Sequence, residues 1–356
     1  MKTVTLEMER LRNLNSGLGQ YCLHLGRALA QAPQGMHFVG YMAEYLSGIL
    51  GPAVTTLPLN KCHKWTGVPV ETNLWHCMHQ DSAYFPKRKN AVLTMTIHDL
   101  NFLERPDYGA WKKKLKTKRL QHKIDRCRGL VYISDYVKSW VHRSLNVPSG
   151  TVEQVIYNGV QVEAATMNQT HAAMAPYLFS IGMHPKKNYE VALPILQANP
   201  GLRWVIAGSD VKNYRAKLTG QASKMGVSDR LMFAGPISET DKWQWYAQCE
   251  AFVFPSLSEG FGLPVLEAMA FGKPVFLSNR TSLPEIGGSE AYYFESFEPT
   301  EVVNTFEQGM QHFNNDPEKA QRLKNWSAGF TWQKAAQSYA AFFETMLSNN
   351  PQINHN

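Results

Sequence analysis

Short apolar runs alternate with amphipathic stretches along most of the chain. Apolar runs rich in β-branched and aromatic residues are typical of buried strands. They predict two series of strands, at 37–42, 91–97, 129–134 and 152–157, and then at 177–182, 203–208, 230–235, 251–256 and 274–278. Stretches with helical periodicity lie between these runs, at 17–31, 110–126, 135–145, 188–198, 211–225 and 240–248. Strands that alternate with helices form parallel sheets with crossover helices, so the sequence predicts an α/β fold.

The two series of strands indicate two domains. A chain of 356 residues is also longer than one typical hydrophobic core requires. The break is expected within 158–177, a polar and Ala-rich stretch without strand periodicity. We therefore predict an N-terminal domain at 1–165 and a C-terminal domain at 175–330. The tail at 332–349 reads as one or two closing helices that pack back toward the N-terminal domain.

The stretch PSLSEGFGLPVLEAM, residues 255–269, has the most informative pattern in the chain. It starts at the end of a predicted strand, passes through a glycine-rich turn and continues as a helix. Pro264 suits the first helical position, where its missing N–H costs nothing, and Gly272 suits the C-terminal cap. The helix N-terminus is therefore expected at the carboxyl edge of the sheet, where its dipole favours an anion.

Two glutamates, Glu259 and Glu267, flank this turn eight positions apart. Glu267 can accept hydrogen bonds from hydroxyl groups such as those of a ribose, and Glu259 can face another part of the same ligand. Gly260 and Gly262 allow the backbone to approach that ligand closely. Taken alone, Glu259 is better explained as a turn carboxylate and Glu267 as a solvated helix residue. The whole pattern favours a site for a nucleoside diphosphate that carries a hydroxyl-rich group.

The chain is moderately basic. Its 36 Lys and Arg exceed its 29 Asp and Glu, and a large share of the positive charge lies in 112–123. A basic surface can contact nucleic acid, an anionic membrane face or a phosphorylated substrate, although such a run is also explained as a solvated helix face. The run contains no aromatic-interleaved nucleic-acid motif, so a nucleic-acid-binding protein remains the less favoured alternative.

The sequence contains no stretch of about 18 consecutive apolar residues, and its N-terminus lacks the apolar core of a secretory signal. We therefore expect a cytoplasmic protein without a transmembrane helix. An odd number of scattered cysteines favours a reduced protein over a disulfide framework. These residues are Cys22, Cys62, Cys77, Cys127 and Cys249.

Several cofactor motifs are incomplete or absent. The first glycine-rich loop has the form G-x-G-x-x-C, ending at Cys22, and lacks the third glycine of a dinucleotide site. The cysteines and histidines at 62–63 and 76–79 lack zinc-site spacing. There is no P-loop and no Asp-x-Asp, a motif that holds a divalent ion in many sugar transferases. We therefore expect neither a metal nor a cofactor.

The order of these blocks resembles that of retaining glycosyltransferases of family 4, the glycosyl transferases group 1. The segment SEGFGLPVLEAMAFGKPV at 258–275 resembles the two-glutamate signature of this family. Further similar segments are NSGLGQYCLHLGRAL (15–29), TIHDL (96–100), VYISDYVKSWV (131–141), VIYNGV (155–160), YLFSIGMHPKKNYEVAL (177–193) and SLPEIGG (282–288). The resemblance implies a GT-B fold, in which two Rossmann-like domains face each other across a cleft.

The resemblance also implies roles for individual residues. Glu267 would hold the ribose hydroxyls of a nucleotide-sugar donor, Lys187 with Lys186 would neutralise the departing diphosphate, and Glu259 would hold sugar and diphosphate. His98 would touch the transferred sugar. The remaining donor-binding positions implied are Gly17, Gly19, Ile237, Gly260, Phe261, Gly262 and Leu263.

Two departures from the family pattern affect the donor geometry. The family often has Arg-Lys where this chain has Lys186-Lys187, and some members have an arginine where it has Met183. Lysine supplies charge but not the two-pronged hydrogen bonding of arginine.

The function implied is metal-independent transfer of a sugar, with its α configuration retained, to a saccharide or lipid-linked acceptor. The narrowest interpretation is α-mannosyl transfer from GDP-mannose in bacterial surface polysaccharide or lipopolysaccharide assembly. The alternative is glucosyl or N-acetylglucosaminyl transfer from a UDP-sugar. A lipid-linked acceptor would bring residues 112–123 into peripheral contact with the inner face of the membrane.

Overall fold

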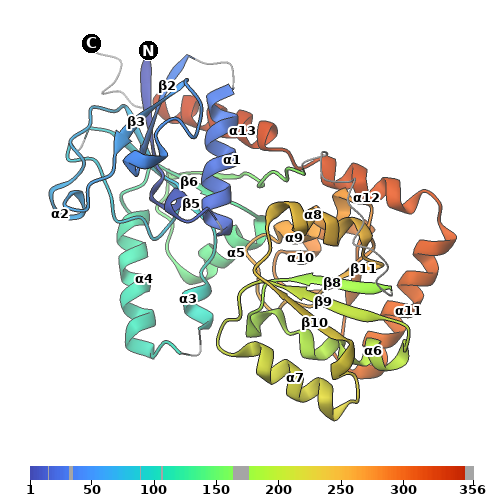
Figure 1. Cartoon of the computed structure of the whole chain (residues 1–356). Coiled ribbons are helices and arrows are strands. Elements are labelled where there is room, and N and C mark those ends of the chain that lie inside the picture. The colour runs from blue at the N-terminus through green and yellow to red at the C-terminus, as the bar shows by residue number, and fades with distance from the viewer. Residues whose placement is uncertain (15, 32–34, 89, 106, 163–175, 349–356) are drawn as a thin grey trace. The chain divides into compact units, whose positions relative to one another are not determined.

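The chain divides into two compact units in its computed structural model, which describes residues 1–14, 16–31, 35–88, 90–105, 107–162 and 176–348 (Figure 1). Unit 1 contains Met1–Gly159 and the segment that begins at Thr331. Unit 2 is Val160–Phe330. Each unit has its own sheet, and all strand pairs in both sheets are parallel. The predicted α/β fold class is confirmed.

The sheet of unit 1 has seven strands in the order β3-β2-β1-β4-β5-β6-β7. Their bounds are β1 Lys2–Glu7, β2 Met36–Met42, β3 Val54–Pro58, β4 Leu74–Cys77, β5 Val92–Ile97, β6 Gly129–Tyr132 and β7 Val152–Val155. The order grows outward in both directions from β1 and β4. The loops after these two central strands therefore diverge at the carboxyl edge, which is where open α/β sheets bind ligands.

Unit 1 contains the following helices: α1 Gly17–Gln31, α2 His63–Thr66, α3 Asn101–Glu104, α4 Ala110–Ile124, α5 Asp135–Ser144 and α13 Trp332–Ser348. Short 3₁₀ turns lie at Glu9–Arg12 and Glu44–Leu46. The apolar faces of α1 and α13 share one hydrophobic core with β1 and β2. The predicted closing segment is thus a single helix that belongs to unit 1.

A buried hydrogen-bond network joins α13 to the sheet of unit 1. The hydroxyl of Tyr339 on α13 lies 2.8 Å from Thr96 Oγ1 and 2.7 Å from the hydroxyl of Tyr21 on α1. Thr96 Oγ1 also lies 2.9 Å from Nε2 of His76, whose Nδ1 is 2.8 Å from Thr94 Oγ1. Because buried polar groups are costly unless they are paired, this network fixes how α13 docks on the sheet.

The chain leaves unit 1 and returns to it at adjacent points. The Val160 N–H donates to the carbonyl of Phe330 at 2.9 Å, so unit 2 starts and ends side by side. On the unit 1 side, a Cβ added to Gly159 would lie 2.1 Å from the backbone nitrogen of Trp332. Only glycine allows the outgoing and returning segments to run this close together.

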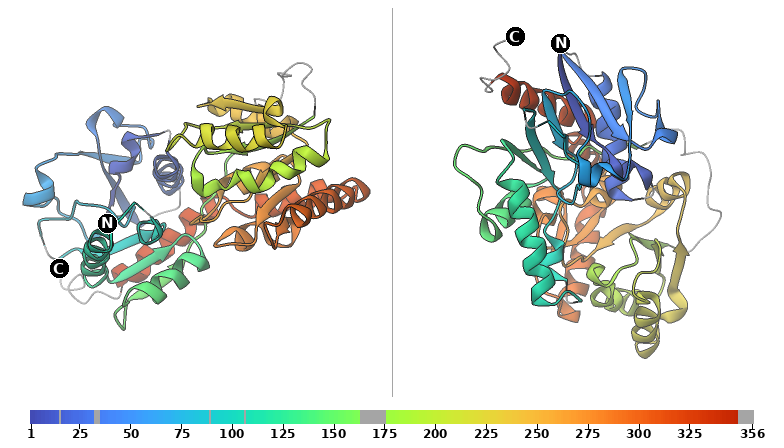
Figure 2. Two further views of the ribbon diagram at one scale, coloured as in Figure 1. Left: turned by 90° about the horizontal axis from the view of Figure 1, so that it is seen from below. Right: turned by 90° about the vertical axis from the view of Figure 1, so that its left-hand side faces the viewer.

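The sheet of unit 2 has six strands in the order β10-β9-β8-β11-β12-β13. Their bounds are β8 Tyr177–Ile181, β9 Arg203–Ala207, β10 Leu231–Gly235, β11 Ala251–Phe254, β12 Val275–Ser278 and β13 Tyr292–Phe294. The helices are α6 Leu193–Ala198, α7 Tyr214–Lys224, α8 Glu239–Gln248, α9 Leu263–Ala270, α10 Leu283–Gly287, α11 Pro299–Asn315 and α12 Lys319–Ala328. The strand order reverses between β8 and β11. Right-handed crossovers therefore put α6 and α7 on one face and α8 and α9 on the other, as Figures 1 and 2 show.

All nine predicted strands are present, and four further strands were missed. β1, with the sequence KTVTLE, has polar residues at alternate positions, although its last four residues are buried. β3 (VTTLP) and β4 (LWHC) contain polar residues that interrupt the apolar run, and β13 has only three residues. The predicted helix at 188–198 is a 3₁₀ turn, Tyr189–Ala192, followed by α6, because Pro194 suits only a helix start. Much of the predicted break at 158–177 lies outside the described residues.

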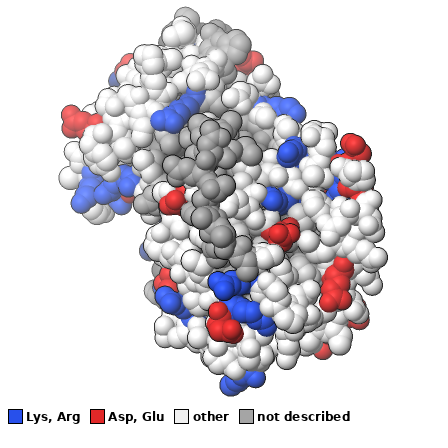
Figure 3. Space-filling view, turned by 45° about the vertical axis from the view of Figure 1, so that its right-hand side comes forward, with Lys and Arg blue, Asp and Glu red and all other residues white. Residues whose placement is uncertain are grey.

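No helix in the described part of the chain is both long enough and apolar enough to cross a membrane. On the face drawn in Figure 3, Lys and Arg are interspersed with Asp and Glu, and most of that face carries neither. The basic run at 112–123 falls on α4, which contains seven Lys and Arg and no acidic residue.

Candidate active site

The residues that follow β8 and β11 meet where the strand order of unit 2 reverses. β8 and β11 are adjacent parallel strands, so the segment containing Lys186 and Lys187 and the loop containing Glu259 leave the same edge side by side. Lys187 Nζ lies 2.7 Å from Glu259 Oε1, and Lys186 Nζ lies 3.5 Å from Glu259 Oε2. Three residues predicted from two distant segments are therefore in direct contact.

The pair of Lys187 and Glu259 is buried and ionised. Their side chains are 10% and 11% exposed. Burial lowers the pKa of Lys187 to about 8, although the charge of Glu259 opposes this shift. Burial alone would raise the pKa of Glu259, but the charges of Lys187 and Lys186, with hydrogen bonds from Lys187 and Ser256, lower it to about 2. At neutral pH both groups therefore carry their charges in a site of low polarity.

Two neighbouring residues, Gly182 and Phe254, limit the positions that the Lys187 side chain can take. Gly182, after β8, has φ of 94°, and a Cβ there would lie 2.9 Å from Lys187 Cε. On another side, the Lys187 ammonium lies 4.0 Å from the ring centroid of Phe254. A glycine and an aromatic ring thus confine the lysine so that its ammonium points at Glu259.

Serine and threonine side chains hold the Glu259 loop in place. Ser256 Oγ donates to Glu259 Oε1 at 2.6 Å. Thr281 Oγ1 accepts from the Glu259 N–H at 3.1 Å, and Ser282 Oγ lies within 3.0 Å of the carbonyls of Glu259 and Phe261. The turn ends at Gly262, whose φ of 112° requires glycine. The sequence reasoning assigned no role to these hydroxyls, although Ser256 lies within the quoted motif.

Helix α9 starts directly after this turn. Pro264 is its second residue, and Gly272 lies just beyond its end with φ of 68°. Leu263 is its first residue. Its dipole places positive potential at the same edge as the two lysines. The helix N-terminus, Lys186 and Lys187 are therefore three sources of positive potential around one carboxylate.

Glu267 lies on α9 and is held by two residues of α8. Its Oε1 lies 2.9 Å from Lys242 Nζ and its Oε2 accepts from the Tyr246 hydroxyl at 2.9 Å. Lys242 and Tyr246 are one helical turn apart on α8, which begins at Glu239, just beyond Ile237. Because a carboxylate oxygen has two lone pairs, each oxygen keeps the capacity to accept a second hydrogen bond. Sequence reasoning missed Lys242 and Tyr246; their spacing of four residues was the available signal.

His98 follows β5 in unit 1 and is fixed by backbone and side-chain contacts. Its Nε2 lies 2.9 Å from the Met78 carbonyl, so Nε2 carries the hydrogen and Nδ1 is the acceptor nitrogen. Its backbone N–H donates to Gln80 Oε1 at 3.0 Å. Burial lowers the pKa of His98 to about 4. The imidazole is therefore neutral at pH 7 and is better suited to accepting a hydrogen bond than to holding a proton.

The predicted glycine loop lies beside His98, because Tyr21 of α1 packs edge-on against the His98 ring at 4.5 Å. Gly17 has open space where a Cβ would lie. Gly19 does not: a Cβ there would lie 2.0 Å from the Asn13 carbonyl oxygen, and its N–H donates to Ser16 Oγ. Gly17 has the free approach that a ligand contact needs, whereas the packing of the loop alone already requires glycine at position 19.

One buried carboxyl at the same edge of unit 1 was not predicted. Glu7 ends β1, is only 2% exposed, and accepts from the Glu9 N–H at 3.0 Å. Burial raises its pKa to about 7.

The predicted site residues form two groups. One group in unit 2 gathers around Glu259 and α9, and the other in unit 1 comprises His98 and the start of α1.

Residues 168–328 match the family model described as glycosyl transferases group 1. A curated relative, the O-antigen chain mannosyltransferase B of Escherichia coli, is 28% identical over 227 residues. That match covers 59% of this chain and 58% of the relative. A second mannosyltransferase of Escherichia coli, WbdA, is also 28% identical, but the match covers only 28% of its length. The chain therefore spans part of the length of these relatives.

Two solved structures are similar to the whole chain. Sucrose-phosphate synthase from Thermosynechococcus elongatus has a TM-score of 0.75 and 17% identity, and the match covers 98% of this chain and 100% of that one. HepE of Anabaena, solved with UDP and glucose, has a TM-score of 0.73 and 16% identity, with 97% and 100% covered. These likenesses show a shared fold. The predicted resemblance to glycosyl transferases group 1 is confirmed.

The Lys187–Glu259 pair predicts a specific pattern of stability. Glu259→Gln leaves a buried ammonium without its main counter-charge, so the free energy of unfolding should fall by about 3 kcal/mol. The double variant Lys187→Met with Glu259→Gln removes that charge too and should recover most of the loss. Urea unfolding followed by circular dichroism measures both, with the exposed Glu301→Gln as control. A single variant as stable as the parent, or a double variant no better than the single one, would contradict the pairing.

Proposed function

We propose that this chain, whose residues 168–328 match the family model of glycosyl transferases group 1, is a retaining hexosyltransferase that uses a nucleotide sugar. Its acceptor would be a saccharide or a lipid-linked saccharide. The observation that carries the proposal is the buried contact of Lys187 with Glu259 at the point where the strand order of unit 2 reverses. Charges are kept at such a position, despite the cost of burial, where a charged ligand requires them.

The proposed donor site divides into two ends. At one end, Lys186, Lys187 and the α9 N-terminus would receive the diphosphate. At the other end, Glu267, oriented by Lys242 and Tyr246, would accept hydrogen bonds from the ribose hydroxyls. Ile237, just before α8, would lie beside the base. The two glutamates flank the first turn of one short helix, which suits a ligand with charge in the middle and hydroxyls at both ends.

The chemical demand on this site is to stabilise charge on the departing diphosphate. Ammonium groups and a helix dipole that are already in place meet this demand without reorganisation. Before a donor binds, Glu259 keeps Lys187 charged and directed. A diphosphate would compete for the same ammonium and leave Glu259 available to sugar hydroxyls. In this scheme no metal ion is needed, and none of the site residues acts as a metal ligand.

His98 would position the donor sugar rather than act as a base. Its Nδ1 can accept a hydrogen bond from a sugar hydroxyl, while the pKa of about 4 makes it a weak proton acceptor. Tyr21 against one side of the ring and the Met78 carbonyl at Nε2 fix its orientation. Gly17 and Gly19, at the start of the helix that contains Tyr21, would lie near the same part of the donor.

The proposed donor is GDP-mannose, and the proposed pathway is assembly of a bacterial surface polysaccharide or lipopolysaccharide. The support is the similarity to the O-antigen chain mannosyltransferase B and WbdA. UDP-sugars are the alternative donors, since the solved structure of Anabaena HepE contains UDP and glucose. We further propose a cytoplasmic location with peripheral contact to the membrane through the exposed Trp111 and the lysines that follow it on α4.

A screen of nucleotide sugars tests this function directly. GDP-mannose should raise the melting temperature of the chain and be slowly hydrolysed, whereas UDP-glucose and UDP-N-acetylglucosamine should have smaller effects at equal concentration. Differential scanning fluorimetry and detection of released nucleotide measure the two quantities. A preference for either UDP-sugar would replace the donor assignment. No response to any nucleotide sugar would contradict the proposed function itself.

Loss of Glu267 and loss of Lys187 should have different kinetic effects. Glu267→Gln removes an acceptor of ribose hydrogen bonds in both ground and transition states, so donor binding should weaken by about 1.5–3 kcal/mol. Lys187→Ala removes charge that matters most as the diphosphate departs, so kcat should fall more than the donor KM rises. Steady-state kinetics with circular dichroism as a folding check separates them. Unchanged donor affinity in Glu267→Gln, or full activity in Lys187→Ala, would refute the respective role.

Chelation tests the absence of a metal requirement. If the lysines and the α9 dipole stabilise the leaving group, transfer should continue at the parent rate in EDTA. The measurement is product formation with and without chelator, followed by addition of manganese or magnesium. Complete loss of activity in EDTA that either ion restores would show that the charge stabilisation is assigned to the wrong groups.

A further inference from the structure

A cavity of about 790 Å³ lies in unit 1 along one side of α4. Its walls are the loop at 80–85, Phe102 of α3 and the face of α4 that carries Lys116, Arg119 and Lys123. These three cations are three or four positions apart, so they line up along one side of the helix. We name this cavity the α4 groove. Its volume is within the range of small-molecule sites.

The charge in the α4 groove is strongly one-sided. Five Lys and Arg line it, against one carboxylate, Asp81. Asp81 lies 3.9 Å from Lys116, at the limit of an ion pair. The Lys123 ammonium donates to the Gln80 carbonyl at 2.8 Å, and burial lowers its pKa. Within the described residues, neither Lys123 nor Arg119 has a carboxylate within 4 Å. The groove is therefore complementary to an anion.

The groove also has an apolar part. Phe85, Phe102 and Leu115 line it beside the cations. Arg126 lies 5.0 Å from the ring centroid of Phe85, and Lys116 lies 5.7 Å from that of Phe102. A site of this kind suits a phosphoryl group attached to a less polar or stacking portion, rather than a free inorganic ion in bulk water.

Gln80 joins the groove to His98. Its carbonyl accepts from Lys123 in the groove, while its side-chain oxygen accepts from the His98 N–H and its amide donates to the Asp99 carbonyl. Gln80 is therefore the residue that separates the groove from His98, the histidine assigned to the donor sugar. An acceptor must place its hydroxyl within about 3–3.5 Å of the reacting carbon. The neighbouring groove is then well placed to receive the rest of the acceptor.

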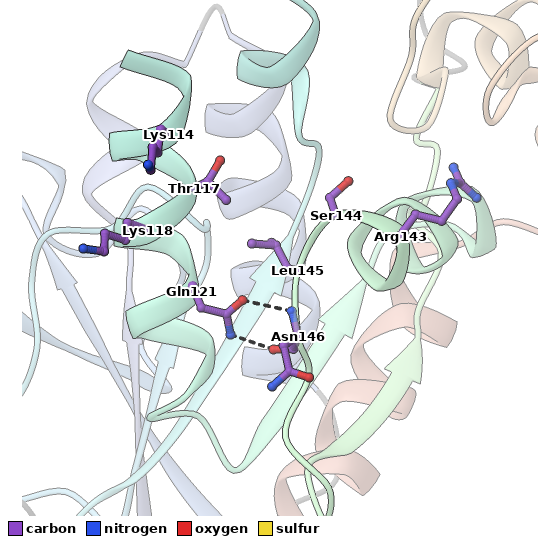
Figure 4. A pocket seen from close by; sticks show the side chains of 8 residues that line it. All are labelled: Lys114, Thr117, Lys118, Gln121, Arg143, Ser144, Leu145 and Asn146. Atoms are coloured by element: carbon purple, nitrogen blue, oxygen red, sulfur yellow. Dashed lines mark hydrogen bonds between the residues drawn. The ribbon is translucent and has the colours of Figure 1, made fainter. Parts of the chain in front are cut away.

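A second cavity, of about 690 Å³, lies against another face of α4, shares Lys118 with the groove and is less suited to this role (Figure 4). Thr117 points from α4 toward Leu145 and Asn146, but Lys118 and Arg143 point away from them. The amide of Gln121 is already paired with the backbone of Asn146, at 2.6 and 2.9 Å. None of its lining residues contacts Gln80 or His98 by a hydrogen bond in the described part of the chain.

We propose that the α4 groove binds the phosphoryl group of the acceptor, so that the acceptor is a saccharide carried on a phosphate or diphosphate. This inference depends on the proposed glycosyltransferase function. The cations on one side of α4 would bind the phosphoryl oxygens, and Phe85 and Phe102 would contact the group beyond them. The sugar would then extend past Gln80 toward His98.

The test uses inorganic pyrophosphate as the probe on the full chain, with binding measured by calorimetry at fixed ionic strength. The parent should bind pyrophosphate at two sites, the α4 groove and the site of Lys187. Lys116→Gln with Arg119→Gln should lower the affinity of the first site by about tenfold or more. Arg119→Gln alone should reduce the affinity of the groove for pyrophosphate partly. Because Arg119 is exposed, this single variant should fold normally and serves as the control for misfolding. Lys187→Ala should affect only the second site.

Lys112→Gln with Lys113→Gln is the matched control, since it removes the same charge from the same helix outside the groove. It should leave pyrophosphate binding unchanged but reduce salt-sensitive adsorption to phosphatidylglycerol vesicles. If the groove and control variants weaken pyrophosphate binding equally, only the general charge of α4 is involved and the groove is refuted. The groove is equally refuted if the groove variant reduces vesicle adsorption alone. If the parent binds pyrophosphate at the groove alone, and Lys187→Ala leaves that binding unchanged, the groove stands and the donor assignment is contradicted.

Discussion

The buried ion pair of Lys187 and Glu259 is the interaction on which the proposed donor site depends. Neither charge would be stable at its position alone, because each has lost most of its contact with water. The two charges come from loops that follow adjacent strands, so the pair forms only when β8 and β11 are correctly aligned. The surrounding groups, Gly182, Phe254 and Ser256, direct the ammonium toward the carboxylate. The chemistry of the site and the folding of unit 2 therefore depend on the same contact.

The α/β architecture and the core of the donor site could be predicted from sequence because both have strong local signals. Buried parallel strands such as β11 read as continuous apolar runs, and the turn before α9 has glycine and proline at positions that permit few other conformations. Glu259 was identified from its turn after a predicted strand, and Lys187 from the resemblance to family 4. Their contact depends on the strand order of the sheet, which cannot be read from local sequence patterns.

Other parts of the site could not be predicted, because their residues form no recognisable local sequence pattern. β1 and β4 are central to the sheet of unit 1, yet β1 has alternating polar residues and the apolar run of β4 is interrupted by His76. Without them, the loop that contains Gln80 could not be placed beside His98. Lys242 and Tyr246 look like ordinary surface residues of α8 until α9 packs against that helix. Glu7 resembles any acidic residue near a chain terminus, and only the fold shows that it is buried.

The insertion of unit 2 between Gly159 and Thr331 has a consequence for synthesis on the ribosome. Unit 2 is one continuous segment whose ends are hydrogen-bonded to each other, so it can fold as soon as it has emerged. Unit 1 cannot complete its core at that stage, because α13 follows unit 2 in the chain and is made after it. The apolar surfaces of α1, β1 and β2 that α13 covers must stay exposed while the whole of unit 2 is translated. Chaperones that recognise nascent chains should therefore bind unit 1 rather than unit 2, and release it only after α13 has left the exit tunnel.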